Sequence, residues 1–338
     1  MASDKPTHGI DRRNFLKSSA GITAAAMIAG CSGGPAKSGG SNGSNGGGGG
    51  GTQFVTIGTG GTGGVYYPLG GGMADIMNKN LKNVEATAES TGASVENCRL
   101  VANGEMTMAL ALGNAVLLAV NGEGDFDKAL DLKAAFGAYQ NSTQVVTTKG
   151  SGIQTIPDMK GKKISVGAPG SGTEVIAKEL LNYFDISYKD IDAQRLSFSE
   201  TATAIQDGQV DAGFWSVAYP ASSIQNLASQ KNIAFVKFPK KDLNQITSKF
   251  DYYSKGTIPA GTYKGVDEDV QVPGVTNTMV VKSSMSDDFA YKLTKSVFEH
   301  LDSLADVHQA ANQFEGTARA APIDLHPGSK KYFDEAGL

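Results

Sequence analysis

Two segments of the sequence share one order of elements: a short β-rich strand, a glycine-rich loop and an amphipathic helix. The first has a strand at 54–57 and a loop at 58–64, and the second has a strand at 163–166 and a loop at 167–172. Apolar residues recur at helical spacing after each loop. They are Leu69, Met73, Ile76, Met77 and Leu81 in the first helix, and Ile176, Ala177, Leu180, Leu181 and Phe184 in the second. Strands that alternate with helices predict an α/β architecture with parallel strands.

The repeated unit favours two similar α/β lobes. Further strands are expected at 84–88, 210–215 and 275–282, and further helices at 197–206, at 287–304 and from Ser94 onward. Open α/β sheets bind ligands at the carboxyl ends of their strands, which is where both glycine loops fall. If the lobes face each other, the two loops line one cleft.

The beginning of the chain has the features of an export signal. A twin arginine at 12–13 precedes an apolar stretch at 20–30, which is too short to span a bilayer and suits a signal peptide. Small residues lead directly to Cys31, as in a lipoprotein cleavage box. We therefore predict that residues 1–31 are a twin-arginine lipoprotein signal peptide and that Cys31 carries the lipid. The Gly/Ser-rich residues 32–52 are predicted to be a flexible linker.

Composition excludes several classes of protein. The formal net charge of -4 provides no broad basic field, which argues against a nucleic-acid partner. The cysteines are Cys31 and Cys98, so no disulfide framework is proposed. Cys98 has helical spacing with Val95 and Val101, and we expect it to be a small buried side chain.

Metal or haem ligands are also sparse. Beyond Cys98, the mature chain offers His300, His308 and His326 without clustered Cys–His spacing. We expect no cofactor, no metal and no catalytic residues.

The glycine loops and helix starts predict a site for negative charge. Glycines let the backbone approach a ligand closely, and each helix start leaves N–H groups free. Ser171 and Glu174 have the spacing of a capping box, so a helix is expected to start there with its amides exposed. With no Lys or Arg in either loop, recognition would rest on amides and on hydroxyl groups, those of Thr62, Ser94, Ser171 and Thr173. Trp215 and Tyr219 are expected to supply an apolar wall.

Six different sequence blocks follow one another along the chain. They are 58–68 (GTGGTGGVYYP), 91–97 (TGASVEN), 160–174 (KGKKISVGAPGSGTE), 207–214 (DGQVDAGF), 258–263 (IPAGTY) and the closing 322–329 (PIDLHPGS). Together these blocks resemble the TAXI family, the extracytoplasmic solute receptors of TRAP transporters. The resemblance covers about Phe54 to Leu338.

The resemblance implies a two-lobe periplasmic-binding-protein fold of type II, with a hinge and a ligand cleft between the lobes. We place lobe 1 at 53–147 plus 276–338 and lobe 2 at 148–275. It also implies a small carboxylate ligand, such as glutamate, glutamine or 2-oxoglutarate, and delivery of that ligand to a TRAP membrane permease subunit.

The family's ligand contacts are carried over onto matching positions of this sequence. The expected ligand-binding set is Thr62, Gly63, Gly64, Tyr66, Tyr67, Ser94, Asn97, Gln144, Ser171, Gly172, Thr173, Trp215 and Tyr219. Two features depart from the family pattern. Ala93 stands where a second glycine is expected, and a lipid anchor is not typical of receptors that float freely in a periplasm.

Two alternatives stay open at this point. Gly58, Gly60 and Gly63 satisfy G-x-G-x-x-G, and Glu85 or Glu89 could contact a ribose, so an exported dinucleotide-binding enzyme is one. The other is a ligand sensor that uses the same fold without transport.

Overall fold

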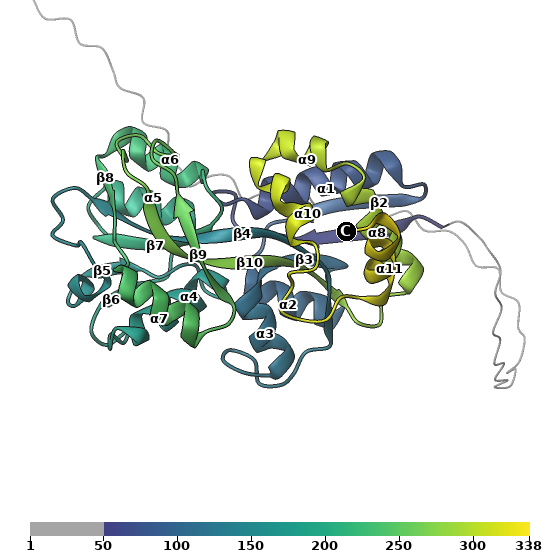
Figure 1. Cartoon of the computed structure of the whole chain (residues 1–338), viewed down its shortest axis with the longest axis horizontal. Coiled ribbons are helices and arrows are strands. Elements are labelled where there is room, and N and C mark those ends of the chain that lie inside the picture. Colours follow the sequence, from purple (N-terminus) through teal and green to yellow (C-terminus); the bar gives the residue numbers. More distant parts are fainter. Residues whose placement is uncertain (1–50) are drawn as a thin grey trace, which may run out of the picture. The chain divides into compact units, whose positions relative to one another are not determined.

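A computed structural model describes residues 51–338 (Figure 1). The predicted signal peptide, Cys31 and nearly all of the predicted linker lie outside the described residues. The strands are β1 (Gln53–Gly58), β2 (Val84–Glu89), β3 (Met108–Leu112), β4 (Leu132–Thr148), β5 (Lys163–Ser165), β6 (Asp192–Gln194), β7 (Ala212–Val217), β8 (Ile233–Phe235), β9 (Tyr253–Ile258) and β10 (Val270–Lys282).

The α-helices are α1 (Tyr66–Asn80), α2 (Ser94–Asn103), α3 (Gly113–Asn121), α4 (Gly172–Tyr183), α5 (Phe198–Gln206), α6 (Ser222–Gln230), α7 (Lys240–Lys249), α8 (Asp287–Phe298), α9 (Leu301–Val307), α10 (Phe314–Thr317) and α11 (Pro327–Ala336). Two 3₁₀-helices, η1 (Ile156–Met159) and η2 (Gln309–Gln313), complete the set. None of the helices described in residues 51–338 has the length and apolar character needed to cross a bilayer.

The strands form one mixed sheet in the order β2-β1-β3-β10-β4-β7-β5-β6, with β8 paired to β4 and β9 to β10. The expected parallel pairing is confirmed at both ends of this order. β1 is parallel to β2 and β3, and β5 is parallel to β6 and β7. The central strands β4 and β10 run antiparallel to each other and to their neighbours. The fold class is therefore α/β, as predicted.

The long strands β4 and β10 connect two strand groups, one made of β1, β2 and β3 and the other of β5, β6 and β7. β4 pairs with β10 through residues 132–142 and with β7 through residues 142–147. Likewise, β10 pairs with β3 near its carboxyl end and with β9 near its start. Figure 1 shows the two strands side by side. The predicted lobe boundaries fall within β4 and β10, at 147/148 and 275/276, and these boundaries stay predictions.

The predicted apolar faces of the first two loop-linked helices are confirmed. In α1, Leu69, Met73 and Met77 are fully buried, and in α4 the residues at 176, 177, 180 and 181 are fully buried. Leu81 and Phe184, the last members of each predicted face, are the C-cap residues and are only partly buried.

Cys98 is buried within α2, as predicted. Burial raises the pKa of its thiol to about 12, because a thiolate would lose its hydration there. The group is therefore a small core side chain that stays protonated at neutral pH.

One predicted helix is wrong in its extent. The segment expected to be a single helix at 287–304 is divided into α8 and α9, because His300 leaves the helical conformation with φ of -134°. The imidazole Nδ1 of His300 lies 2.9 Å from the carbonyl oxygen of Ser296, one of the last carbonyls of α8. The break allows α8 to pack against α11 while α9 packs against α1.

Candidate ligand-binding site

A cavity lies where four loop-to-helix segments meet the carboxyl ends of β3 and β7 and the interior of β4. The cavity and its mouth enclose about 640 Å³ that is free of protein atoms. None of the lining residues carries a charged side chain. They are Gly60, Gly61, Gly64, Val65, Tyr66, Thr91, Gly92, Ala93, Ser94, Leu112, Asn141, Ala168, Ser171, Gly172, Thr173, Ser197, Phe198, Ser216 and Val217.

The start of α4 contributes free N–H groups. The Ser171 hydroxyl oxygen accepts the Glu174 N–H at 3.1 Å, and the Ser171 carbonyl accepts the Val175 N–H. The earlier N–H groups of the helix, those of Gly172 and Thr173, have no acceptor among the described residues. A Cβ on Gly172 would lie 2.5 Å from Leu112 Cδ1, so only glycine lets this helix start approach so closely.

The predicted capping box at this helix is formed only in part. The side chain of Glu174 pairs with Arg195 and does not return to the Ser171 N–H, which donates to the Ala168 carbonyl. The helix nevertheless begins where the spacing predicts, because the serine side of the cap is intact.

At the start of α2, where the sequence predicts the Ser94 hydroxyl at the site, the second and third N–H groups of the helix are capped. The Gly170 carbonyl accepts the N–H groups of Val95 and Glu96, at 3.0 and 3.3 Å. A backbone oxygen from the second glycine loop therefore caps α2. What α2 presents to the cavity is the Ser94 side chain, and only 1% of that residue's surface is exposed.

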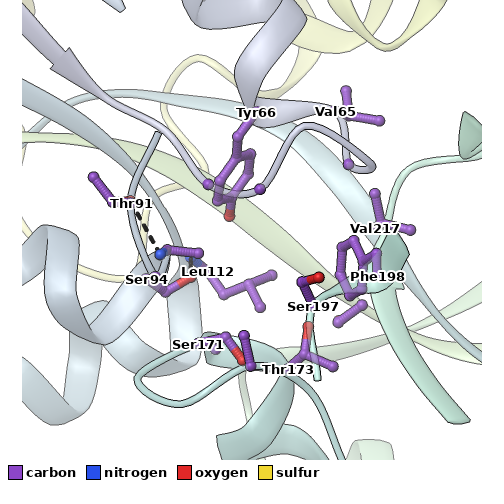
Figure 2. Close-up of a pocket in the computed structure, with 18 of the residues that line it drawn as sticks. Val65, Tyr66, Thr91, Ser94, Leu112, Ser171, Thr173, Ser197, Phe198 and Val217 are labelled. Carbon is purple, nitrogen blue, oxygen red and sulfur yellow. Dashed lines mark hydrogen bonds between the residues drawn. The ribbon is translucent and has the colours of Figure 1, made fainter. Parts of the chain in front are cut away.

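A further helix start, that of α5, takes part in the cavity. Ser197 caps α5 in a complete capping box with Glu200. Ser197 and the next residue, Phe198, line the cavity (Figure 2). The sequence prediction placed this helix correctly but did not assign it to the site. The signal was available, since Ser-x-x-Glu after a strand marks a third start of the same kind.

Three serine hydroxyl groups lie at the cavity, those of Ser94, Ser171 and Ser197. Ser94 Oγ accepts the Leu112 N–H at 3.0 Å, and the oxygens of Ser171 and Ser197 accept the third N–H of their own helices. Each hydroxyl has one hydrogen to donate. The Ser94 hydroxyl interacts with the Tyr66 phenol oxygen and the Ser197 hydroxyl with the Glu200 carboxylate, whereas the Ser171 hydroxyl hydrogen has no acceptor among the described residues. Figure 2 shows the three serines around the cavity, with Tyr66 on the opposite side from Ser171 and Thr173.

The apolar part of the lining comes from Phe198, Val65, Leu112 and Val217 rather than from the predicted pair Trp215 and Tyr219. Trp215 is fully buried behind the Phe198 ring, which stacks on it at 6.2 Å between centroids. Its indole N–H donates to Ser223 Oγ at 3.1 Å. Trp215 therefore supports the wall of the cavity without reaching it.

Of the predicted ligand-binding residues, six line the cavity: Gly64, Tyr66, Ser94, Ser171, Gly172 and Thr173. Tyr66 contributes its ring, while its hydroxyl donates to Asn277 Oδ1. Burial raises the pKa of Tyr66 far above its ordinary value, so the phenol stays neutral. Ligand contact by these six residues stays a prediction.

The other predicted residues lie outside the lining: Thr62, Gly63, Tyr67, Asn97, Gln144, Trp215 and Tyr219. Two of them hold the surrounding structure together. The Asn97 amide donates to the carbonyls of Thr59 and Leu110, each at 2.7 Å. The Gln144 amide donates to the Val217 carbonyl and accepts from the Tyr263 hydroxyl.

Gly63 holds the first glycine loop against α5 and α6. Its carbonyl accepts the hydroxyl hydrogens of Ser223 at 3.0 Å and of Ser222 at 3.5 Å. A Cβ on Gly63 would collide with Ser199 Oγ. The loop is therefore closed over by α5 and α6.

Within the described residues, no group of three or more His, Cys, Asp and Glu side chains is arranged to hold a metal ion. With uncharged walls, and with the free Ser171 hydroxyl hydrogen and the free amides at the start of α4, the cavity suits a ligand that accepts hydrogen bonds.

A family model described as the NMT1-like family matches residues 57–337 of this chain. The chain belongs to the NMT1-like family. A model of the twin-arginine translocation pathway signal sequence matches residues 9–29, which confirms the predicted export signal. Lipid attachment at Cys31 stays a prediction.

Among the solved structures similar to this NMT1-like protein are two that have a TM-score of at least 0.50 and share its fold. MatC of Rhodopseudomonas palustris, solved with bound malate, matches with a TM-score of 0.52 at 12% identity, covering 83% of this chain and 96% of that chain. A protein of Bordetella bronchiseptica RB50 matches with a TM-score of 0.50 at 15% identity, covering 84% and 88%. The periplasmic aliphatic sulphonate binding protein SsuA of Escherichia coli matches with a TM-score of 0.47 at 14% identity, covering 83% and 78%. The fold is the two-lobe type II fold of periplasmic binding proteins, as predicted.

Proposed function

We propose that this protein is the extracytoplasmic solute-binding receptor of a TRAP transporter. It captures a small carboxylate, of the glutamate, glutamine or 2-oxoglutarate type, by closure of two lobes and delivers it to the membrane permease subunit. It acts as a binding protein and catalyses no reaction.

The single observation that carries this proposal is the polarity of the cavity. The hydroxyl hydrogen of Ser171 and the amides of Gly172 and Thr173, all at the start of α4, are donors without acceptors in the described chain. A carboxylate accepts hydrogen bonds only, so it satisfies such a set. The start of α4 adds roughly half a positive charge near the same space.

The lack of a charged lining residue favours a small anion over a large one. A dinucleotide would have to lie along the first glycine loop, where the Gly63 carbonyl is bound by Ser223 and a Cβ on Gly64 would lie 3.3 Å from the Phe198 ring. The side chains of α5 and α6 occupy the space that a pyrophosphate would need. The exported dinucleotide-binding enzyme is therefore the weaker alternative.

The TRAP assignment rests on the ordered sequence blocks, and the export signal agrees with a receptor that works outside the cytoplasm. We further propose that Cys31 carries a lipid and that residues 32–52 tether the binding domain to the membrane. A Cys31→Ala variant should then be exported but lost from the membrane fraction. If this variant stayed wholly with membranes, lipid attachment at Cys31 would be wrong.

Isothermal titration of the purified protein with glutamate, glutamine, 2-oxoglutarate and succinate tests the ligand class. We expect at least one carboxylate to bind, with modest dependence on salt because no Lys or Arg clamps it. Tight binding of NAD or of a cation, with no response to any carboxylate, contradicts the proposal. Co-purification with a TRAP membrane subunit would support transport, whereas association with a histidine kinase alone would favour a sensor.

A further inference from the structure

Asn141 lies on β4 and lines the cavity, with 2% of its surface exposed. Its partner across β10 is Val275, and the next residue, Ser142, begins the pairing with β7. Asn141 therefore stands where the central strand passes from one strand group to the other. None of the sequence blocks drew attention to it.

The orientation of the Asn141 amide is fixed by its surroundings. Its Nδ2 donates to the Ser216 carbonyl at 2.9 Å. A carbonyl oxygen can only accept, so the NH₂ group must face Ser216 and Oδ1 must face away from it. The hydrogen bond from Nδ2 to the Ser216 carbonyl therefore fixes the position of Asn141 Oδ1.

Asn141 Oδ1 is buried and has no donor among the described residues. It is the only lining side chain with a buried polar atom in this condition. Nearby carbonyls are already used: those of Ser216 and Val217 accept from side-chain amides, and that of Ala168 accepts the Ser171 N–H. A buried acceptor without a donor is unfavourable, so a ligand that supplies a donor here gains affinity.

We propose that Asn141 determines specificity by accepting a hydrogen bond from a hydroxyl group on the ligand, so that within the class of small carboxylates a hydroxycarboxylate is preferred over the glutamate, glutamine and 2-oxoglutarate types named above. This inference rests on the proposed function, because it assumes that the carboxylate occupies the donor groups at the start of α4. The hydroxyl hydrogen then meets Asn141 Oδ1, a buried acceptor that has no donor among the described residues.

A hydroxyl group fits this acceptor better than the groups that replace it in related acids. An ammonium group has three donor hydrogens and a charge, while the lining has no acidic side chain and a single buried acceptor without a donor. A keto group has no hydrogen, so its oxygen would face Asn141 Oδ1 with both atoms as acceptors. A methylene group would leave Oδ1 without a partner.

Matched ligand sets test this assignment by titration calorimetry on the purified protein. Each set keeps one carbon skeleton and changes only C2: 2-hydroxyglutarate, 2-oxoglutarate, glutamate and glutarate; malate, aspartate and succinate; lactate, pyruvate, alanine and propionate. Both enantiomers of each chiral acid are used. In the skeleton that binds, we expect the hydroxy acid to bind about tenfold or more tightly than the other members.

The Asn141→Ala variant adds a second comparison. Without the acceptor, the protein should bind the hydroxy acid and the keto acid about equally. The ratio of the two affinities should therefore fall about tenfold, to about one. Asn78→Ala is the matched control, because Asn78 also bridges backbone groups, those of Ala86, but lies outside the cavity lining. It should keep the wild-type ratio. The ligand series on the wild-type protein decides the matter even if Asn141→Ala fails to fold.

The outcomes separate this inference from the proposed function. If a keto, amino or unsubstituted acid binds as tightly as its hydroxy counterpart, Asn141 does not select for a hydroxyl, although the receptor still binds a carboxylate. The same conclusion follows if Asn141→Ala keeps the wild-type ratio. If no carboxylate of any set binds, the carboxylate proposal fails, and the inference about Asn141 fails with it.

Discussion

The carbonyl oxygen of Gly170 accepts the backbone N–H of Val95 at 3.0 Å and that of Glu96 at 3.3 Å. This bond joins the second glycine loop to the first turn of α2, two segments that belong to different predicted lobes. It caps a helix start with backbone from elsewhere in the chain, so the first turn of α2 is satisfied only while the two segments are together. Lobe opening would break it.

Hydrogen exchange at Val95 and Glu96 should therefore report on closure. We expect these two amides to exchange more slowly when a bound carboxylate holds the lobes together, because their acceptor is lost in an open form. The Asn97 N–H is the internal control, since it donates to Ala93 within the same helix start and should respond less. Exchange followed by NMR with and without ligand makes the measurement. Equal exchange rates at Val95 and Glu96 in both states would show that this contact does not open.

Gly172→Ala should weaken ligand binding by about 1–3 kcal/mol, the range found for overpacked sites. The added methyl group would lie 2.5 Å from Leu112 Cδ1 and 2.8 Å from Ser94 Oγ, so the start of α4 must move away from the cavity. Gly71→Ala is the matched control, because nothing lies within 4 Å of its Cβ position and it is also helical. Calorimetric affinities of both variants check this. An unchanged affinity for Gly172→Ala would place the ligand elsewhere.

Ser171→Ala and Ser286→Ala separate a capping role from a binding role. Both serines accept an N–H at the start of a helix, Ser171 for α4 and Ser286 for α8, and only Ser171 lines the cavity. Each change should lower the free energy of unfolding by about 1 kcal/mol. Only Ser171→Ala should also lower affinity, by about tenfold for a lost donor. Denaturant titration and calorimetry measure the two effects, and equal affinities of the two variants would contradict a ligand contact at Ser171.

Local patterns predicted much of the fold, and six of the nineteen residues that line the cavity. The two strand–glycine loop–helix units appear where the spacing predicts them, because residues close together in the sequence specify both an amphipathic helix and its serine cap. Ser171, Gly172 and Thr173 follow from such a pattern. The break at His300 does not, since it depends on how α8 and α9 pack against α11 and α1.

The remaining site residues depend on contacts between distant segments. Glu174 has the spacing of a capping residue, yet its carboxylate forms an ion pair with Arg195 instead. β7 is buried along its whole length, so no alternation showed that Trp215 lies behind Phe198 instead of facing the ligand. Asn141 became a candidate only when the pairing of β4 and the bond to Ser216 were known. Such features need the tertiary structure.

Phe198→Ala should weaken binding and alter the fluorescence of Trp215, which is the only tryptophan in the sequence. Phe198 lines the cavity and stacks on the Trp215 ring, so its loss opens the apolar wall and exposes the indole. We expect a red-shifted emission and a loss of stability of about 3 kcal/mol, because Phe198 is partly buried in the core. Phe54→Ala is the control, since Phe54 is 70% exposed. An emission spectrum identical to that of the wild type would contradict the stacked arrangement.

The stability of the protein should decrease in mild acid through His308. Burial lowers the pKa of His308 below its ordinary value, because the charged imidazole would lose hydration. The two ring contacts act in opposite directions: Nε2 lies 3.3 Å from the Pro220 carbonyl, which raises the pKa, whereas Nδ1 accepts the Ala310 N–H at 3.1 Å, which favours the neutral ring, and burial outweighs the Pro220 contact. Protonation at Nδ1 would remove that acceptor.

The unfolded chain therefore takes up this proton at a higher pH than the folded chain. The stability linked to His308 is present above the unfolded pKa of about 6.5 and is lost as the pH falls toward the lower pKa of the folded state. A His308→Gln variant has no such proton to bind, so its melting temperature should fall less than that of the wild type between about pH 7.5 and pH 5.5. Thermal unfolding of both proteins across this interval provides the measurement. Parallel curves for the two proteins would show that His308 does not titrate in this way.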